Sequence, residues 1–512
     1  MSEISNFNIV SLFDKSADNC PDKIALIDKD DTEYSFEKLR QLAFLQASVF
    51  SSKGILRGDR ILVFIPMRIE LYITVLALFY IGVTPVFLDE WVSIERLDVC
   101  CRLAKCKGFI APLKLRIMAV ASKELRRIKF WFGMPSLKFK NVMHLESYST
   151  SENDTALITF TTGSTGVPKA ANRTHGFLKA QFAALQPLLE TDQQNKNSAD
   201  MPMLPIVLLL NLGNGTTSVI ADFKPSKPLK FDSGKILDQI IKHKVVSITT
   251  SPYYAARLAE NLKAEFSGLR KMLIGGGPVF PDLAETICNK FSGLDLLVVY
   301  GSTEAEPISH TSGKDLIDFH VVISADKGLL VGFPDTSANV KLISFDYKTG
   351  NEFIPYTDIN QPGEICVSGN HVLEKYIDNA VAEKQNKIWH EGVCWHRTGD
   401  AGYFDSDGRL ILLGRCVEII HLNGQVYYPF LAEYIFQKLP GILRGTLVLK
   451  EQRLLVVLQS ESDLDNNEAL KLVAEKFPLT SVIFHKQIPM DQRHHSKIDY
   501  VKLREELKSR IN

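Results

Sequence analysis

Short apolar runs alternate with helical patterns through most of this chain, and that alternation constrains the fold more than any other feature of the sequence. Residues 37–52 follow Ser35, a favourable N-cap, and place Leu39, Leu42 and Ala43 on one face of a helix. Similar patterns predict a helix at residues 236–243 and buried strands at residues 60–66, 245–250 and 294–300. Such alternation is typical of parallel sheets covered by helices, so the predicted fold class is α/β.

The chain has 512 residues, which exceeds a single hydrophobic core, so at least two domains are expected. After about residue 400 the pattern changes to a hairpin that turns at residues 404–408, and then to a shorter α+β stretch. The elements expected there are helices near residues 430–439 and 467–477 and strands near residues 446–449 and 454–459. We predict a large N-terminal domain of parallel-rich sheets, residues 1–415, and a small α+β C-terminal domain, residues 416–512.

Residues 71–88 are uncharged over eighteen positions, which is the lower limit for a helix that crosses a membrane. Gly82 and Pro85 interrupt this stretch, so a helix ending near Gly82 and a buried strand explain it better. The N-terminus lacks a basic region followed by an apolar run, so no secretory signal is expected. The eight cysteines form no CxxC pair, which fits a reducing compartment and argues against structural zinc. We expect a cytoplasmic protein that is not integral to a membrane.

Charge excludes some classes of function. The chain carries 59 Lys and Arg residues and 59 Asp and Glu residues, so a general nucleic-acid binder is not expected. Residues 105–129 are locally basic and partly amphipathic. A solvated helix face is the favoured interpretation of this segment, and a surface that sits near lipid is the alternative. Peripheral association with a membrane therefore stays open.

The most informative segment is residues 157–169, where a predicted strand runs into a loop rich in hydroxyls and glycine that closes with Lys169. Glycines let the backbone N–H groups approach anionic oxygens, and the lysine supplies charge. The loop is not a Walker A motif, because Gly163 and Gly166 are three apart and Ala170 follows the lysine. Phosphate binding is favoured over an ordinary surface turn. The candidate residues are Thr161, Thr162, Gly163, Ser164, Thr165, Gly166 and Lys169.

Four more segments and one lysine follow this loop in a fixed order. They are residues 274–278 (IGGGP), 300–304 (YGSTE), 396–400 (HRTGD) and 413–415 (LGR), and Lys497. With these motifs the sequence resembles the adenylate-forming superfamily, which includes acyl-CoA synthetases, adenylation domains of peptide synthetases and luciferases. The resemblance covers nearly the whole chain. It implies an AMP-forming ligase that uses ATP and Mg²⁺ to activate a carboxylic acid.

The resemblance also implies where the nucleotide binds. The loop formed by Gly275, Gly276, Gly277 and Pro278 would lie beside adenine. Tyr300 would stack on the adenine ring, with Gly301 and Ser302 turning the backbone toward the phosphates. Asp400 would accept hydrogen bonds from the ribose hydroxyls, and Arg415 would hold the ribose or a phosphate.

The implied catalytic groups are two lysines, a threonine and a carboxylate. Thr303 would donate to the α-phosphate and Glu304 would be the Mg²⁺ ligand. Lys169 would neutralise the leaving pyrophosphate, and Lys497 would bridge the carboxylate and the α-phosphate. In the resembling family the C-terminal domain rotates between two half-reactions, and Arg415 and Val417 fall where that hinge lies.

Several departures from ordinary acyl-CoA synthetases point to one branch of the superfamily. The histidine that often follows the Leu-Pro of residues 204–205 is missing, and Val417 replaces the usual charged hinge residue. Residues 493–498 read RHHSKI and residues 395–397 read WHR, which is similar to the β-lactone synthetases of olefin biosynthesis. In that branch the β-hydroxyl of a fatty acid attacks its own activated carbonyl without CoA.

Two alternatives remain from the sequence, namely an acyl- or aryl-CoA ligase, and an acyl-loading partner of a carrier protein or a weakly active nucleotide binder. Residues 206–212 form an apolar run that fits an acyl pocket and ordinary core equally well. His494 and His495 are adjacent, which rarely suits ligands of one metal ion, so they are expected to shape the site around Lys497.

Overall fold

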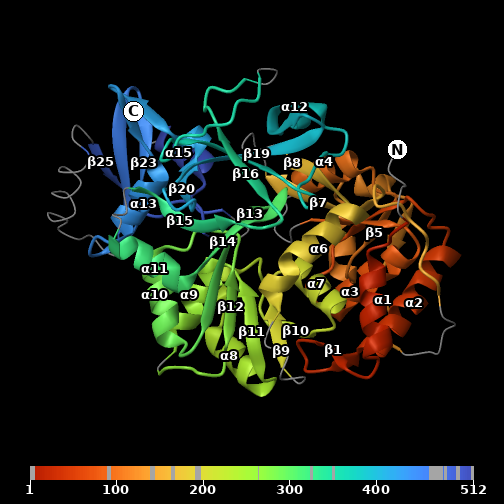
Figure 1. Cartoon of the computed structure of the whole chain (residues 1–512). Coiled ribbons are helices and arrows are strands. Elements are labelled where there is room, and N and C mark those ends of the chain that lie inside the picture. Colours follow the sequence, from red (N-terminus) through yellow and green to blue (C-terminus); the bar gives the residue numbers. More distant parts are fainter. Residues whose placement is uncertain are drawn as a thin grey trace.

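The computed structural model describes most of the chain. The described residues are 6–88, 94–138, 145–162, 168–190, 198–262, 264–322, 327–348, 352–460, 477, 481–491 and 496–508. Two large sheets covered by helices form most of the molecule, and a smaller sheet lies near the C-terminus (Figure 1). This arrangement confirms the predicted α/β class with a small α+β part near the C-terminus.

The first sheet follows the order β6-β5-β3-β4-β7-β8, and all its pairings are parallel except β7 with β8. Its strands are β3 (Arg60–Val63), β4 (Thr84–Phe87), β5 (Gly108–Ile110), β6 (Phe130–Phe132), β7 (Thr155–Thr162) and β8 (Pro168–Thr174). The predicted phosphate loop joins β7 to β8. This hairpin places Thr161 opposite Lys169.

The second sheet contains fourteen strands among the described residues, and its direction changes midway. From β1 to β13 most neighbours are parallel, whereas β13 pairs with β14 antiparallel and the antiparallel pattern continues to β16. Along the sheet the strands are β16 (Asn339–Ile343), β17 (Gly363–Ser368), β19 (Val393–Phe404), β20 (Leu410–Arg415), β15 (Leu329–Pro334), β14 (Ala305–Ser312), β13 (Asp295–Ser302), β12 (Lys271–Ile274), β11 (Val245–Thr250), β9 (Ala199–Pro202), β10 (Thr217–Val219), β1 (Ile24–Ile27) and β2 (Glu33–Ser35), with β18 (Lys387–His390) paired to β19. The predicted hairpin at residues 404–408 is confirmed as the β19–β20 connection.

Helices cover these sheets. They are α1 (Val10–Asn19), α2 (Phe36–Ser52), α3 (Ile69–Tyr80), α4 (Ile94–Ala104), α5 (Leu113–Ala119), α6 (His175–Leu189), α7 (Pro205–Asn214), α8 (Ser233–Lys242), α9 (Pro252–Glu260), α10 (Pro281–Lys290), α11 (Gly313–Val322) and α12 (Ala380–Asn386). Every residue of α3 is buried, as expected for a helix that is apolar all round. The helix ends before Gly82 and β4 follows, so the interpretation of residues 71–88 is confirmed. In the described part of the chain no helix is long and apolar enough to span a membrane.

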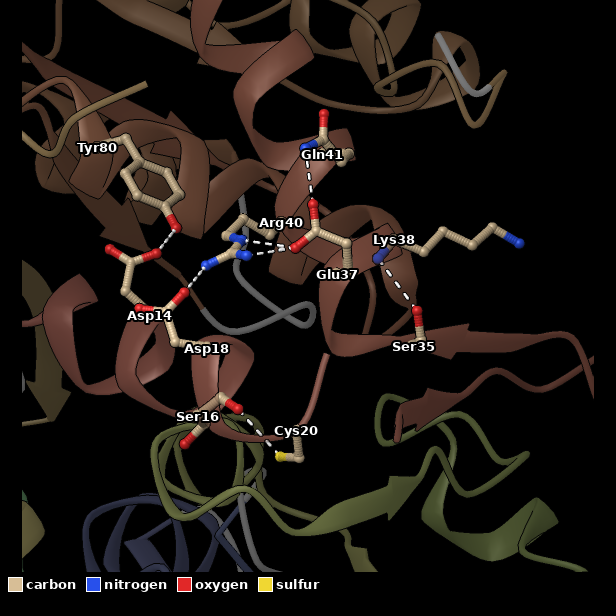
Figure 2. Close-up of polar contacts among 10 residues, drawn as sticks. All are labelled: Asp14, Ser16, Asp18, Cys20, Ser35, Glu37, Lys38, Arg40, Gln41 and Tyr80. Carbon is tan, nitrogen blue, oxygen red and sulfur yellow. Dashed lines mark hydrogen bonds and ion pairs between the residues drawn. The ribbon is translucent and has the colours of Figure 1, made fainter. Parts of the chain in front are cut away.

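Polar contacts tie the first helices together (Figure 2). The Ser35 hydroxyl accepts a hydrogen bond from the Lys38 backbone N–H at 3.2 Å, which confirms the predicted N-cap of α2. Arg40 on α2 pairs with both Glu37 and Asp18, so α1 and α2 are joined by an ion pair.

The part of the chain after residue 416 has its own small core. Its elements are the strands β21 (Ile420–Leu422), β22 (Gln425–Tyr427), β23 (Ile442–Lys450), β24 (Arg453–Ser460) and β25 (Ser481–Phe484) and the helices α13 (Pro429–Gln437) and α15 (Tyr500–Lys508). The helix expected at residues 467–477 lies almost wholly outside the described residues. Contacts also join the region of α13 to the start of α10. The Tyr434 and Phe280 rings stack with their centroids 4.6 Å apart, and the Lys438 ammonium lies 3.5 Å from the Asp282 carboxylate. A mobile domain at residues 416–512 stays a prediction.

One buried carboxyl in this part predicts a pH-dependent stability. Glu433 on α13 accepts a hydrogen bond from the Tyr500 hydroxyl, and burial raises the pKa of Glu433 from 4.5 to about 8. An unfolded chain loses this proton near its ordinary pKa, whereas the folded chain holds it longer, so stability should fall as pH rises from about 4.5 to about 8. Glu433→Gln should flatten that fall in melting temperature. The exposed Glu505→Gln on α15 is the control, and an unchanged slope in Glu433→Gln would refute the assignment.

Candidate functional site

Three of the predicted nucleotide-binding side chains form one hydrogen-bonded chain. The Tyr300 hydroxyl at the end of β13 donates to Asp400 Oδ2 at 2.8 Å, and Arg415 Nη1 donates to Asp400 Oδ1 at 2.7 Å. Asp400 and Arg415 face each other across the β19–β20 pair, so the sheet register brings them together. The negative charge of the Asp400 carboxylate raises the pKa of the neighbouring Arg415 guanidinium. This cluster presents hydrogen-bonding groups of the kind that hold ribose hydroxyls and phosphates.

Glu304, the predicted metal ligand, lies in the turn between β13 and β14. The Tyr376 hydroxyl donates to Glu304 Oε1 at 3.0 Å, which orients the carboxylate. The ammonium of Lys169 lies 5.7 Å from the centroid of the Tyr376 ring, and that of Lys387 lies 5.6 Å from it. A hard carboxylate suits Mg²⁺ bound together with phosphate oxygens, and the two ammonium groups suit the phosphates.

The two cations near Glu304 are both buried. Burial lowers the pKa of Lys169, while the charge of Glu304 opposes that shift. Lys387 is more deeply enclosed, donates to the Leu373 carbonyl, and has its pKa lowered by burial to about 8. His396 pairs with Lys387 across β18 and β19, and burial lowers the pKa of His396 well below its usual value. His396 is therefore uncharged near neutral pH, and Lys169 and Lys387 are the groups here that can carry positive charge beside Glu304.

The glycine loop after β12 meets the segment that carries Lys497. Gly276 has a φ of +83°, which an L side chain rarely adopts, and Gly277 lies directly against Ser496. A Cβ on Gly277 would fall 2.6 Å from the Ser496 Cβ, so no larger residue fits without a shift. Asp491 Oδ1 accepts hydrogen bonds from the backbone N–H groups of Ser496 and Lys497 at 2.9 and 2.7 Å. The structure thus brings Lys497 and the predicted adenine loop to the same place.

A small apolar pocket opens beside this loop. Its walls come from α6, the start of α7 and the strands β11 to β14. The lining residues are Leu185, Leu189, Leu204, Ile206, Val207, Thr249, Leu273, Gly275, Val299 and Glu306. Only the first part of the apolar run 206–212 faces the pocket, because Leu208 and Leu212 belong to the main core. The run is thus partly core and partly pocket wall, and its role as an acyl pocket stays a prediction.

Two polar side chains interrupt the apolar wall of the pocket. Thr249 is 4% exposed, and within the described residues its hydroxyl has no hydrogen-bond partner. A buried hydroxyl without a partner is unfavourable, so this atom is suited to bind a polar group of a ligand. Glu306 lies nearby, with Oε1 3.8 Å from the position of a Cβ on Gly275. The pocket wall therefore offers hydrogen-bonding groups among apolar side chains.

Most of the predicted site residues lie in or next to these clusters. Ser302 Oγ accepts a hydrogen bond from the Glu304 backbone N–H at 3.3 Å, and the Thr303 carbonyl accepts one from Arg173 at 3.1 Å. A Cβ on Gly301 would lie 2.9 Å from the Ala305 carbonyl, so glycine is needed at that turn. Gly163, Ser164, Thr165, Gly166, His494 and His495 lie outside the described residues, as do the side chains of Thr161 and Thr162.

Sequence reasoning missed four residues at the site: Tyr376, Lys387, Thr249 and Glu306. Tyr376 meets Glu304 although 72 residues separate them, and no local pattern indicates such a pairing. Thr249 sits in an apolar strand where threonine is ordinary. Glu306 carried a usable signal, because it is a second carboxylate only two positions after Glu304.

Comparison with known proteins shows the family of the chain. The family described as AMP-binding enzyme matches residues 13–377. The chain is 27% identical over 508 residues to an olefin beta-lactone synthetase of Xanthomonas campestris, covering 92% of this chain and 90% of that protein. It is also 27% identical over 426 residues to a 2-succinylbenzoate–CoA ligase of Bacillus licheniformis, covering 83% of each chain.

Solved structures show the same fold. The O-succinylbenzoate coenzyme A synthetase of Bacillus subtilis in complex with AMP superposes with a TM-score of 0.80 at 21% identity, covering 96% of this chain and 97% of that one. The same enzyme with ATP and a magnesium ion gives 0.78 at 22% identity, covering 96% and 98%. The chain belongs to the AMP-binding enzyme family. It is an adenylate-forming, AMP-forming ligase.

Proposed function

We propose that this enzyme activates a β-hydroxy fatty acid with ATP and closes the resulting acyl-adenylate to a β-lactone. The observation that carries the proposal is the apolar pocket with, in its wall, the Thr249 hydroxyl, which has no hydrogen-bond partner in the part of the chain that the structure describes. An apolar pocket accepts an alkyl chain, and the hydroxyl offers one hydrogen bond to a β-hydroxyl. The relative named an olefin beta-lactone synthetase, which matches nearly the full length of both chains, supports the same choice.

In the first half-reaction the carboxylate oxygen of the acid attacks the α-phosphorus of ATP, the bond to the bridging oxygen breaks, and pyrophosphate leaves. Lys169 holds the leaving phosphates, and Lys497 stabilises the charge that grows on the α-phosphate oxygens. Asp400, Arg415 and Tyr300 fix the nucleoside. Glu304 would hold Mg²⁺, which when bound supplies charge neutralisation for the phosphates.

In the second half-reaction the β-hydroxyl oxygen attacks the activated carbonyl carbon, AMP leaves, and the hydroxyl proton passes to solvent. Because the hydroxyl and the carbonyl belong to one molecule, a high effective molarity replaces an external nucleophile. We also propose that residues 416–512 move as a domain about residues 415–417 between the two steps. The contacts of α13 with α10 would then have to part.

Replacing Thr249 by valine tests the role of the pocket hydroxyl. Thr249→Val should lower kcat/KM for a 3-hydroxy acid about threefold to tenfold, since one neutral hydrogen bond is lost, and leave the plain acid nearly unaffected. Stability should hold or rise, because the removed hydroxyl is buried and has no partner among the described residues. Single-turnover pyrophosphate release, measured with each acid separately, gives the two rates. An equal loss for both acids would remove Thr249 from hydroxyl recognition.

A further inference from the structure

The helix α5 shows an unusual distribution of apolar side chains. Leu113 is 64% exposed and Ile117 65% exposed, and they lie one helical turn apart on the solvent side. Met118 and Val120 beside them are 56% and 55% exposed. The buried residue of the helix is Ala119, the smallest of the set. Leu115 packs against the core, but the four other large apolar groups face water, which is unusual for a surface helix.

The surroundings of α5 are strongly basic. Residues 112–138 contain seven Lys and Arg residues and one acidic residue, Glu124, in a chain whose total charge is balanced. Glu124 is already engaged, because it lies 3.1 Å from Arg127 and 3.4 Å from Arg102. Five cations near the helix are exposed, namely Lys114, Lys123, Arg126, Arg127 and Lys129.

This segment overlaps residues 105–129, the basic stretch for which the sequence allowed two interpretations. One is a solvated helix face and the other is a surface near lipid. Residues 105–129 are not one helix, since they contain the buried strand β5, the short α5 and a 3₁₀ turn at Leu125–Arg127, and the edge strand β6 follows them. A solvated face would expose polar groups and bury apolar ones. The exposed Leu, Ile, Met and Val side chains of this segment therefore favour the interpretation as a surface near lipid.

We propose that the α5 face, which we define as the four apolar residues 113, 117, 118 and 120 and the five exposed cations of residues 114–129, docks reversibly on an anionic lipid bilayer. Apolar side chains of this size enter the boundary between headgroups and acyl chains, while Lys and Arg contact lipid phosphates. With seven residues the helix inserts little, so the charge contribution is essential and association is peripheral. This inference does not depend on which acid the enzyme activates.

The test is co-sedimentation of the full-length enzyme with vesicles. Binding to an equal mixture of phosphatidylcholine and phosphatidylglycerol should exceed binding to phosphatidylcholine alone by about tenfold or more, and should fall as salt rises. Ile117→Asp combined with Met118→Asp should lower binding to anionic vesicles by about tenfold or more. Arg126→Glu combined with Arg127→Glu should do the same.

Val381→Asp is the matched control, because Val381 on α12 is 69% exposed and lies far from α5 in the sequence. It should bind vesicles as the unaltered enzyme does. Pyrophosphate release without vesicles should be unchanged in all variants, since none of these residues lies at the candidate site. The proposal would be overturned by an absence of binding to anionic vesicles, or by binding that does not depend on lipid charge. Equal binding by the α5 variants and the control would also overturn it, whether or not the same face binds a protein.

Discussion

Replacing Lys497 by alanine is expected to slow adenylate formation by about 10²–10³-fold while ATP affinity changes little. The lysine is proposed to meet negative charge that develops only as the α-phosphorus is attacked, so its loss should act on the transition state and not on bound ATP. Its backbone is held by Asp491, and the preceding Ser496 lies against Gly277. Pyrophosphate release at saturating ATP gives the rate, and calorimetric titration gives the ATP affinity.

Lys502→Ala is the control for this result. Lys502 lies on α15 in the same part of the chain, and its side chain is 61% exposed. It should retain the full rate. If Lys497→Ala releases pyrophosphate as fast as the unaltered enzyme, or loses ATP affinity in proportion to rate, Lys497 does not have the proposed role.

Replacing Glu304 by glutamine should reduce the rate of adenylation by about 10²–10³-fold at fixed Mg²⁺, since metal-assisted charge stabilisation contributes several kcal/mol. The amide is nearly isosteric but is a much weaker ligand for a hard cation. The Mg²⁺ concentration for half-maximal rate should rise in the same variant. Tyr376 now donates to Glu304 Oε1, and glutamine retains an oxygen that can accept this bond, so the fold should hold.

Glu374→Gln is the matched control, because Glu374 is exposed and lies two residues from Tyr376. Its rate and its Mg²⁺ dependence should equal those of the unaltered enzyme. A Glu304→Gln enzyme with unchanged Mg²⁺ dependence would mean that the metal is held elsewhere.

Local patterns were sufficient to predict much of the fold. The N-cap at Ser35, the end of α3 before Gly82 and the hairpin at residues 404–408 each depend on a few adjacent residues, and all three are confirmed. The change from parallel to antiparallel pairing at β13 and β14 was not predicted. That change depends on which distant strand pairs with β14, and helix–strand alternation carries no such information.

The candidate site likewise contains residues that local sequence patterns could predict and residues that they could not. Its motif residues could be named from their order in the chain, whereas Tyr376, Lys387 and Thr249 could not. Each becomes informative only through partners brought together by the fold, such as the carboxylate of Glu304 for Tyr376. The exposed apolar residues of α5 show the same limit, because residue types alone do not tell which side of a helix faces the core.

Product analysis with a β-hydroxy fatty acid tests the central claim most directly. The purified enzyme would be given this acid with ATP and Mg²⁺, with and without CoA, and the plain fatty acid would be run alongside. The account predicts AMP and a β-lactone from the hydroxy acid without CoA, and a stalled adenylate from the plain acid, which lacks an internal nucleophile. Turnover of both acids only when CoA is present, with acyl-CoA as the product, would contradict it and identify the enzyme as a CoA ligase.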